Sequence, residues 1–319
     1  MNSEKLLVVD NVTKVFTKGQ GFVKSKIEAV SRVSFALERN RPEIFTLAGE
    51  SGSGKSTVAK LILGFEIPTT GSIVYKGNPV GGLKGKREFI KDVQPIFQNP
   101  FETFNPLKKV QSYFHDTERN FSKFSPGKYP MTERALELVG LTASEIKDKY
   151  PSEMSGGQLQ RASIARALIT NPSLLIADEP VSMIDASLRM SVVNLFKRLK
   201  DEQKVSIIYI THDLATAYYI SDRIAIMLRG QFVEVGAVKK VLDEPLHPYS
   251  QLLKASVPAP DPETRWSEDI TLSDLETSEY TRKGCKFAGR CPKAFDLCRE
   301  QEPEHHAVDD RLVKCHLYA

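Results

Sequence analysis

Short, continuous apolar runs alternate along the chain with stretches of helical periodicity, a pattern typical of an α/β protein. The apolar runs lie at 43–48, 93–97, 174–177 and 205–210. Runs that are apolar at nearly every position predict strands of a parallel sheet that is covered on both faces. The one-face spacing of apolar residues predicts a helix over 131–139, and another helix is expected over 158–168.

The two ends of the chain follow other patterns. Residues 5–38 alternate in a way that predicts an antiparallel strand pair, 6–9 with 30–37, joined by a glycine- and lysine-rich loop over 18–26. A further strand is predicted at 71–75. Prolines accumulate after about residue 250, and the acidic stretch that follows predicts a linker that runs to about residue 280.

A complete phosphate-binding loop follows the strand at 43–48. Residues Gly49 to Ser56 match the pattern G-x-x-x-x-G-K-[ST]. The glycines let backbone amides converge on phosphates, and the helix expected to begin near Lys55 directs its positive end at the same anion. The residues expected to bind ATP here are Gly49, Ser51, Gly52, Gly54, Lys55, Ser56 and Thr57.

Two residues of this loop have distinct expected roles. Lys55 should reach the β- and γ-phosphates, and the hydroxyl of Ser56 should bind Mg²⁺. The alternative is a glycine-rich loop that binds nothing. The strand before the loop and the helix after it disfavour that interpretation.

The apolar run at 174–177 ends in two carboxylates. Asp178 is expected to hold Mg²⁺, directly or through water, and Glu179 is placed to polarise the attacking water. An ordinary strand that ends in a charged turn is the alternative, and the complete phosphate loop earlier in the chain disfavours it.

The tetrapeptide Ser-Gly-Gly-Gln at 155–158 is the most specific signal in the chain. It opens a predicted helix, so its amides form another anion site. With this motif the chain resembles the ATP-binding cassette (ABC) family over most of residues 5–250, although Met154 stands where the family usually has leucine. The resemblance implies that two cassettes pair head to tail around two ATP. The residues then expected to contact the γ-phosphate of a partner cassette's ATP are Ser155, Gly156, Gly157 and Gln158.

The resemblance assigns roles to further residues. Phe16 matches the aromatic that stacks on adenine, with a core aromatic at a strand end as the alternative. Gln98 matches the glutamine that contacts Mg²⁺ and water and relays nucleotide state to the membrane subunit. Asp185 matches the loop that crosses the dimer seam, although the two residues before it depart from the family's usual Ala-Leu. His212 matches the switch histidine that hydrogen-bonds the γ-phosphate, whereas a lone histidine after a strand is usually incidental.

Several segments resemble one subfamily in particular, the oligopeptide/dipeptide importers. These are the Phe-Gln-Asn-Pro run that leads to Asn-Pro over 97–106, the His-Pro-Tyr segment at 247–253 with Val-Pro at 257–258, and the residues after the signature up to Arg161, which favour the F-type of the two ATPases. The resemblance implies an ATP-hydrolysing subunit that works with itself or a sister ATPase beneath two transmembrane permeases, served by an extracytoplasmic solute-binding protein. Oligosaccharide or nickel import with the same architecture is an alternative.

All four cysteines lie near the end of the chain, at Cys285, Cys291, Cys298 and Cys315. Their spacing resembles the C-terminal region of peptide-importer ATPases, where four cysteines can hold a 4Fe-4S cluster. Four thiolates also suit zinc, and free thiols are a further alternative. A reducing cytosol disfavours disulfides. The histidines nearby, at 305, 306 and 316, are expected to be surface residues.

The expected fold is therefore an ABC-type P-loop ATPase of α/β class, with a RecA-like core, an antiparallel β subdomain, a helical subdomain and a small Cys-rich C-terminal region. The expected ATPase domain spans 1–250, with its helical part at about 99–160, and the C-terminal region spans 251–319. The helical part should dock the permeases, with Phe101 and Phe104 as candidate contacts.

Charge and hydropathy limit the partners and the cellular location that are expected. The chain has 44 basic and 40 acidic residues, a nearly even balance that does not imply nucleic acid. The sequence has no apolar run of the ~18–20 residues that span a bilayer, and residues 1–5 lack the pattern of a signal peptide. The expected location is the cytoplasmic face of the membrane, through the permeases. A soluble ABC ATPase acting on DNA or ribosomes, or a non-catalytic regulatory cassette, are the rivals.

Overall fold

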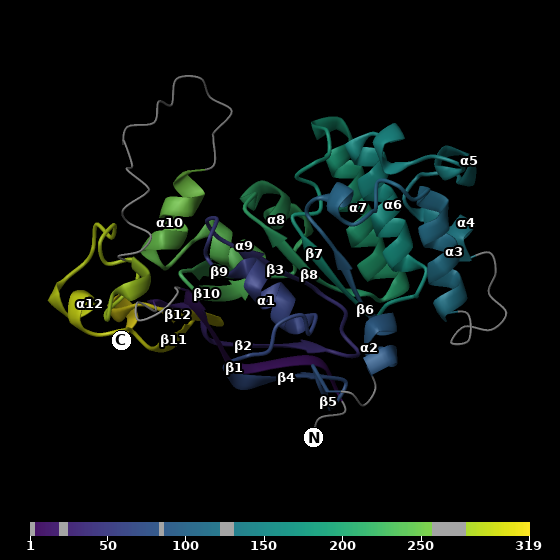
Figure 1. The fold of residues 1–319 in the computed structure, drawn as a ribbon. Coiled ribbons are helices and arrows are strands. Elements are labelled where there is room, and N and C mark those ends of the chain that lie inside the picture. Colours follow the sequence, from purple (N-terminus) through teal and green to yellow (C-terminus); the bar gives the residue numbers. More distant parts are fainter. Residues whose placement is uncertain (1–3, 19–24, 83–85, 122–130, 257–278) are drawn as a thin grey trace. The chain divides into compact units, whose positions relative to one another are not determined.

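The computed structural model describes residues 4–18, 25–82, 86–121, 131–256 and 279–319. Within those ranges the chain forms two compact units (Figure 1). The first unit takes in residues up to Leu6, Leu37–Ile44 and Tyr75–Ile210. The second unit takes in Leu7–Ala36, Phe45–Val74 and Thr211–Ala319. Both units combine strands and helices, as the alternation of patterns predicts.

The first unit is built on buried parallel strands. β7 (Leu174–Asp178) lies between β6 (Val93–Ile96) and β8 (Ser206–Thr211). Leu174 of β7 stands beside Val93 on one side and beside Ser206 on the other. All six residues of β8 are buried, which is possible only for a strand covered on both faces. The parallel strands predicted from the apolar runs are thus confirmed.

Helices accompany these strands in the first unit. The helix predicted over 131–139 is α4, and the helix predicted over 158–168 is α6, which begins earlier, at Gly156. α6 contacts α3, α4 and β6 (Figure 1). The elements of this unit besides the strands above are β5 (Asn78–Pro79), α2 (Lys86–Asp92), η1 (Pro100–Glu102), α3 (Val110–Phe121), α4 (Met131–Leu138), α5 (Ala143–Ile146), η3 (Pro151–Glu153), α6 (Gly156–Leu168) and α7 (Ala186–Gln203).

The second unit contains the predicted N-terminal strand pair. β1 (Lys5–Lys18) lies between β2 (Ser25–Glu38) and β4 (Thr70–Tyr75). The amide of Asn11 donates to Ser34, and the amide of Arg32 donates to Thr13, so residue numbers rise on one strand as they fall on the other. Both strands are longer than predicted and leave less chain for the loop, of which residues 19–24 lie outside the described residues.

The second sheet of this unit runs from the strand before the phosphate loop to the end of the chain. β3 (Ile44–Ala48) pairs in parallel with β9 (Arg223–Leu228), and β9 pairs antiparallel with β10 (Gln231–Ala237). β10 in turn pairs antiparallel with β12 (Arg311–Lys314), which pairs with β11 (His305–Val308). The last strands of the chain therefore extend the sheet that carries the phosphate loop.

The helices of the second unit complete a shared core. They are α1 (Lys55–Ile62), α8 (Leu214–Ile220), α9 (Val238–Asp243), α10 (Pro248–Ala255), α12 (Asp296–Glu300) and the short η4 (His316–Tyr318). Ala48 of β3, Tyr249 of α10 and Phe287 of the C-terminal region belong to one buried cluster. Burying such apolar side chains together ties the C-terminal region to β3 and β9.

The predicted linker lies mostly outside the described residues, at 257–278, and the first described residue after it, Glu279, is fully buried. One sequence expectation is wrong. Phe104, predicted to contact the permeases, is 2% exposed and packs edge-on against Tyr113 at 5.0 Å, whereas Phe101 is 46% exposed. Phe104 is therefore a core residue.

Among the residues that the structure describes, no helix is both long enough and apolar enough to cross a bilayer.

Candidate ATP site

The phosphate loop has the backbone geometry that its glycines predict. Gly49, Gly52 and Gly54 all have positive φ, at 151°, 73° and 104°. A Cβ atom on Gly49 would lie 2.2 Å from the carbonyl oxygen of Met227, and one on Gly54 would lie 2.3 Å from that of Ala29. Both positions therefore admit glycine alone, because neither the conformation nor the space tolerates a side chain.

Lys55, the first residue of α1, is folded back over the loop. Its Nζ atom donates to the carbonyl oxygens of Gly49 at 2.7 Å and Glu50 at 2.8 Å, and to the hydroxyl of Ser53 at 3.3 Å. The residue is buried, whereas Ser56 is exposed. The buried ammonium lies against the loop backbone, where it can exchange these neutral oxygens for phosphate oxygens, since charge-assisted hydrogen bonds are the stronger.

The two carboxylates follow β7 in the first unit. Asp178 ends the strand and Glu179 comes next, with a left-handed φ of 44° and its amide donating to the carbonyl of Ile210 at 2.9 Å. Gln98, just after β6, donates from Nε2 to Oε2 of Glu179 at 3.1 Å. Parallel strands β6 and β7 end at the same edge, so the sheet brings together the glutamine and the glutamate that the sequence assigns to the attacking water.

The signature tetrapeptide lies at the start of α6, also in the first unit. Ser155 is the N-cap residue: its hydroxyl accepts from the amide of Gln158 at 3.2 Å, and the side-chain oxygen of Gln158 accepts from the amide of Ser155 at 3.1 Å. This capping box fixes the helix start. Met154 is buried, so the departure from leucine exchanges one apolar core side chain for another. Asp185 is exposed and is the N-cap residue of α7.

His212 and Phe16 belong to the second unit, as the phosphate loop does. His212 is exposed and directly follows β8, and Asp213 caps α8 by accepting from the amide of Ala215 at 2.9 Å. Phe16, near the end of β1, is 37% exposed, with Nζ of Lys14 4.9 Å from its ring centroid. An aromatic face that is partly open suits stacking on a base better than a closed core does.

Comparisons with known proteins agree with this geometry. Residues 30–182 match the family described as ABC transporter, and residues 233–298 match the oligopeptide/dipeptide transporter, C-terminal region. The oligopeptide transport ATP-binding protein AppF of Bacillus subtilis is 37% identical over 100% of this chain and 99% of its own length. The oligopeptide transport ATP-binding protein OppF of Streptococcus pyogenes serotype M1 is 38% identical over 95% of this chain and 98% of its own. The chain belongs to the ABC transporter ATP-binding proteins.

A solved structure supports the fold of this ABC ATPase. An ATP-binding cassette solved as a dimer in a post-hydrolysis state, bound to ADP and phosphate, superposes with a TM-score of 0.62 at 25% identity. The match covers 73% of this chain and 98% of that one. The ABC fold predicted from the sequence is confirmed, as is its class as an ATPase, and ATP with Mg²⁺ is the expected nucleotide complex of the family.

The four cysteines of the ABC ATPase line a single cavity, together with residues that include His247 and Phe287. All four thiols are free. Burial, and then the neighbouring thiols, raise the pKa of Cys285 to about 11, and burial also raises the pKa of Cys291 and of Cys315. Burial therefore favours the protonated form of these three thiols. Among the described residues, no three His, Cys, Asp or Glu side chains are arranged to hold a metal ion.

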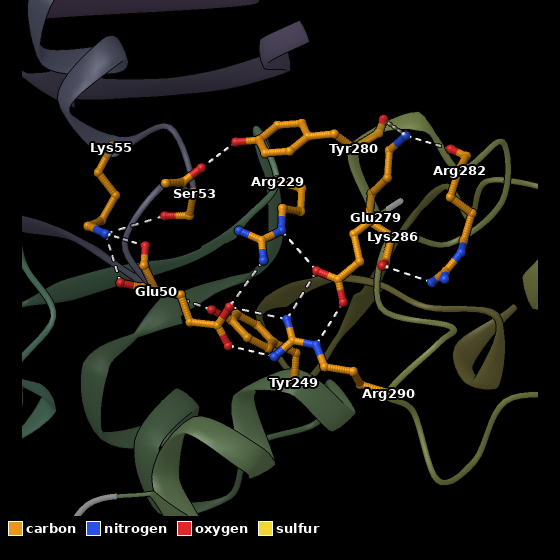
Figure 2. A network of polar contacts seen from close by, with 12 residues as sticks. Glu50, Ser53, Lys55, Arg229, Tyr249, Glu279, Tyr280, Arg282, Lys286 and Arg290 are labelled. Carbon is orange, nitrogen blue, oxygen red and sulfur yellow. Dashed lines mark hydrogen bonds and ion pairs between the residues drawn. The ribbon is translucent and has the colours of Figure 1, made fainter. Parts of the chain in front are cut away.

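The structure also shows a contact at the phosphate loop that the sequence does not predict. Glu50, a variable position of the phosphate-loop pattern, is bound by Arg290, whose Nη1 donates to Oε1 at 2.7 Å and whose Nη2 donates to Oε2 at 3.1 Å (Figure 2). The two residues are separated by 240 positions. No periodicity or motif links residues so far apart, so the only available signal was that Glu50 places a charge beside the phosphate site.

Proposed function

We propose that this ABC ATPase binds and hydrolyses ATP to power an importer of oligopeptides, dipeptides or related solutes. The observation that carries the proposal is the match to peptide transport ATP-binding proteins over the whole chain, including the separate match of residues 233–298 to the C-terminal region of such transporters. The cassette alone would fit many transporters. The C-terminal match narrows the choice to this group.

The residues predicted to bind ATP would divide the work as follows. Lys55 and the loop amides would bind the phosphates, Ser56 and Asp178 would hold Mg²⁺, and Phe16 would stack on adenine. Bound Mg²⁺ supplies positive charge that neutralises the phosphate oxygens. Glu179 would accept a proton from the attacking water while Gln98 orients the water and the carboxylate. The hydrogen bond between Gln98 and Glu179 supports this pairing, and His212 would contact the γ-phosphate.

Hydrolysis would require a second cassette. The capped start of α6 and the exposed Asp185 would meet the ATP of a partner cassette, either a second copy or a sister ATPase. Beneath two permeases, served by an external solute-binding protein, the pair would close on ATP and reopen after hydrolysis. Phe101, which is exposed, is the remaining candidate contact for a permease.

The domain division proposed from the sequence goes with this function. Residues 1–250 would form the ATPase domain, with a helical part at about 99–160, and 251–319 would form the C-terminal region. The ATPase would then be held at the cytoplasmic face of the membrane by its permeases. Purification of the tagged protein from detergent-solubilised membranes, with mass spectrometry of what accompanies it, tests this assembly. Two permeases and a second ATPase are the expected companions, and recovery with ribosomes or DNA would contradict the proposal.

For the cysteines we propose a structural metal site, a 4Fe-4S cluster with zinc as the alternative. The shared cavity of Cys285, Cys291, Cys298 and Cys315 supports it. The fit is incomplete: the enclosed space is about 10 Å³, room for about one water, so the side chains would have to move apart and lose their protons. Iron and sulfide analysis of anaerobically purified protein tests the cluster, and a colourless, zinc-loaded protein would rule it out.

A further inference from the structure

Four charged side chains form a closed ring beside the phosphate loop (Figure 2). Glu279 accepts from Nε of Arg229 at 2.8 Å and from Nε of Arg290 at 2.7 Å. Arg290 also holds Glu50 with two hydrogen bonds, and Nη2 of Arg229 lies 3.7 Å from Oε2 of Glu50. Glutamate and arginine thus alternate around the ring. Glu279 is fully buried and both arginines are nearly so, while Glu50 is 25% exposed.

The same C-terminal segment touches the loop backbone at other points. The hydroxyl of Tyr280 donates to the carbonyl oxygen of Gly52, and the hydroxyl of Tyr249 in α10 accepts from the amide of Glu50 at 3.0 Å. Tyr249, Tyr280 and Arg290 therefore hold an amide, a carbonyl and a side chain of the loop. The loop that must present its amides to phosphate is thus fixed from outside by Tyr249, Tyr280 and Arg290 (Figure 2).

Arg290 is itself held rigidly. Its amide donates to the carbonyl of Phe287 at 2.9 Å, and its guanidinium carbon lies 5.2 Å from the ring centroid of Phe287 and 5.8 Å from that of Tyr249. Phe287 is fully buried and belongs to the core cluster that includes β3 and β9. The guanidinium is thus positioned by the core, and the energetic cost of ordering it is met when the chain folds.

Charge explains why this contact matters for nucleotide. Glu50 lies in the loop that binds the phosphates, where an unpaired carboxylate would repel them. Arg290 neutralises that carboxylate with a bidentate pair, the arrangement in which arginine binds a carboxylate most strongly. Removing Arg290 would leave Glu50 with only the 3.7 Å contact to Arg229, so its negative charge at the phosphate site would be less well neutralised, and one anchor of the loop would be lost.

We propose that Arg290 is a positioning residue for nucleotide binding, through which the C-terminal segment 279–290 holds Glu50 away from the phosphates and fixes the phosphate loop. The C-terminal region would then act on the ATP site of its own chain. This inference rests on the ATP site of the proposed function.

The test is calorimetric titration of the full-length protein with Mg²⁺–ADP, which is not hydrolysed. Arg290→Ala should weaken ADP binding by about 5- to 150-fold, the usual range for coupling between sites. The KM for ATP should rise similarly while kcat changes little. Glu50→Gln/Arg290→Ala should recover most of the affinity, because the carboxylate that Arg290 no longer neutralises is gone. Arg290→Lys keeps the positive charge but cannot make two parallel hydrogen bonds to Glu50. Its affinity for ADP should lie between those of the wild type and Arg290→Ala.

Two control variants distinguish a failure of this inference from a failure of the ATP-site assignment. Arg299→Ala removes an exposed arginine of α12 in the same region and should leave ADP binding unchanged. Lys55→Ala should abolish ADP binding; if it does not, the ATP site itself is wrong. If Arg290→Ala and Arg290→Lys only lower the unfolding temperature and keep wild-type ADP affinity, the ring is structural and the inference fails. If Arg290→Ala does not fold, unchanged affinity in Arg290→Lys alone overturns it.

Discussion

Two glutamates occupy similar positions in the two units and have opposite surroundings. Glu50 comes two residues after β3, and Glu179 comes directly after β7; both strands are buried and lie in parallel pairs. The carboxylate of Glu50 is bound by the guanidinium of Arg290, with Arg229 beside it. The carboxylate of Glu179 accepts a hydrogen bond from the neutral amide of Gln98.

The difference indicates what each carboxylate can do. Both carboxylate oxygens of Glu50 are bound by Arg290, with Arg229 beside one of them, so this carboxylate is placed to hold the loop. A neutral amide contacts Glu179, in keeping with the role of general base proposed for it. Glu179 also has a left-handed φ of 44°, a conformation that costs about 1–2 kcal/mol for a residue with a side chain. Such local strain is commonly found at functional sites.

The largest expected effect is a loss of ATP turnover when Glu179 is replaced. Glu179→Gln should lower ATP turnover by about 10²–10⁴-fold, because the general base is lost, and it should trap bound ATP. Phosphate release measured at saturating ATP, together with filter retention of ATP, gives the result. Near-normal turnover would show that Glu179 is not the general base.

The second prediction concerns the contribution of the charged ring around Glu50 to the free energy of unfolding. Glu279→Ala leaves Arg229 and Arg290 facing each other without the buried carboxylate that joins them. Breaking a buried ion pair by removing one partner costs about 3–5 kcal/mol, so the free energy of unfolding should fall by that amount. Urea unfolding measures it. Glu304→Ala, at an exposed glutamate of the same region, is the control, and an equal loss in both variants would contradict the role of the ring.

The third prediction concerns how the stability of the region around Glu50 depends on pH. His247 caps α10, the helix that carries Tyr249 to Glu50, and burial lowers its pKa to about 3. The unfolded chain binds a proton below about pH 6.5 and the folded chain does not, so stability should fall as the pH falls from about 6.5 towards 3. At one pH unit below 6.5 the loss is about 1.4 kcal/mol.

His247→Asn serves as the comparison for this measurement. Asparagine can still cap the helix but does not titrate. The difference in unfolding free energy between wild type and variant should shrink as the pH is lowered from 7 to 5. A constant difference would show that His247 is not buried in its neutral form.

The smallest expected effect concerns the amide beside Glu179. Gln98→Ala removes one hydrogen bond of about 0.5–1.5 kcal/mol, so ATP turnover should fall by at most about tenfold. Steady-state phosphate release measures it. A loss as large as that of Glu179→Gln would mean that Gln98, rather than the carboxylate, dominates the step.

The strands and helices around the site could be predicted from the sequence because their signals are local. The runs at 174–177 and 205–210 become β7 and β8, and the glycines of the phosphate loop have the conformations that the motif requires. Phe104 was misjudged because an apolar residue in a helical segment carries no sign of which way it faces. Its burial is set by packing against Tyr113 on α3.

The ring at Glu50 could not be predicted, because it depends on residues brought together by the whole second unit. Arg229 lies just after β9, Glu279 and Arg290 lie in the C-terminal region, and Glu50 lies after β3. The positions of the cysteines mark the end of the chain as a separate region. They do not indicate that Arg290, immediately before Cys291, contacts the phosphate loop.

The most direct test of the account measures ATP turnover in Glu179→Gln and Glu50→Gln side by side, with nucleotide binding measured in both. We predict that Glu179→Gln binds ATP and loses about 10²–10⁴-fold in turnover, whereas Glu50→Gln keeps turnover within about tenfold of wild type, since glutamine can still accept a hydrogen bond from Arg290 and adds no negative charge beside the phosphates. Equal losses in the two variants, or a larger loss in Glu50→Gln, would contradict the assignment of one glutamate to chemistry and the other to holding the loop.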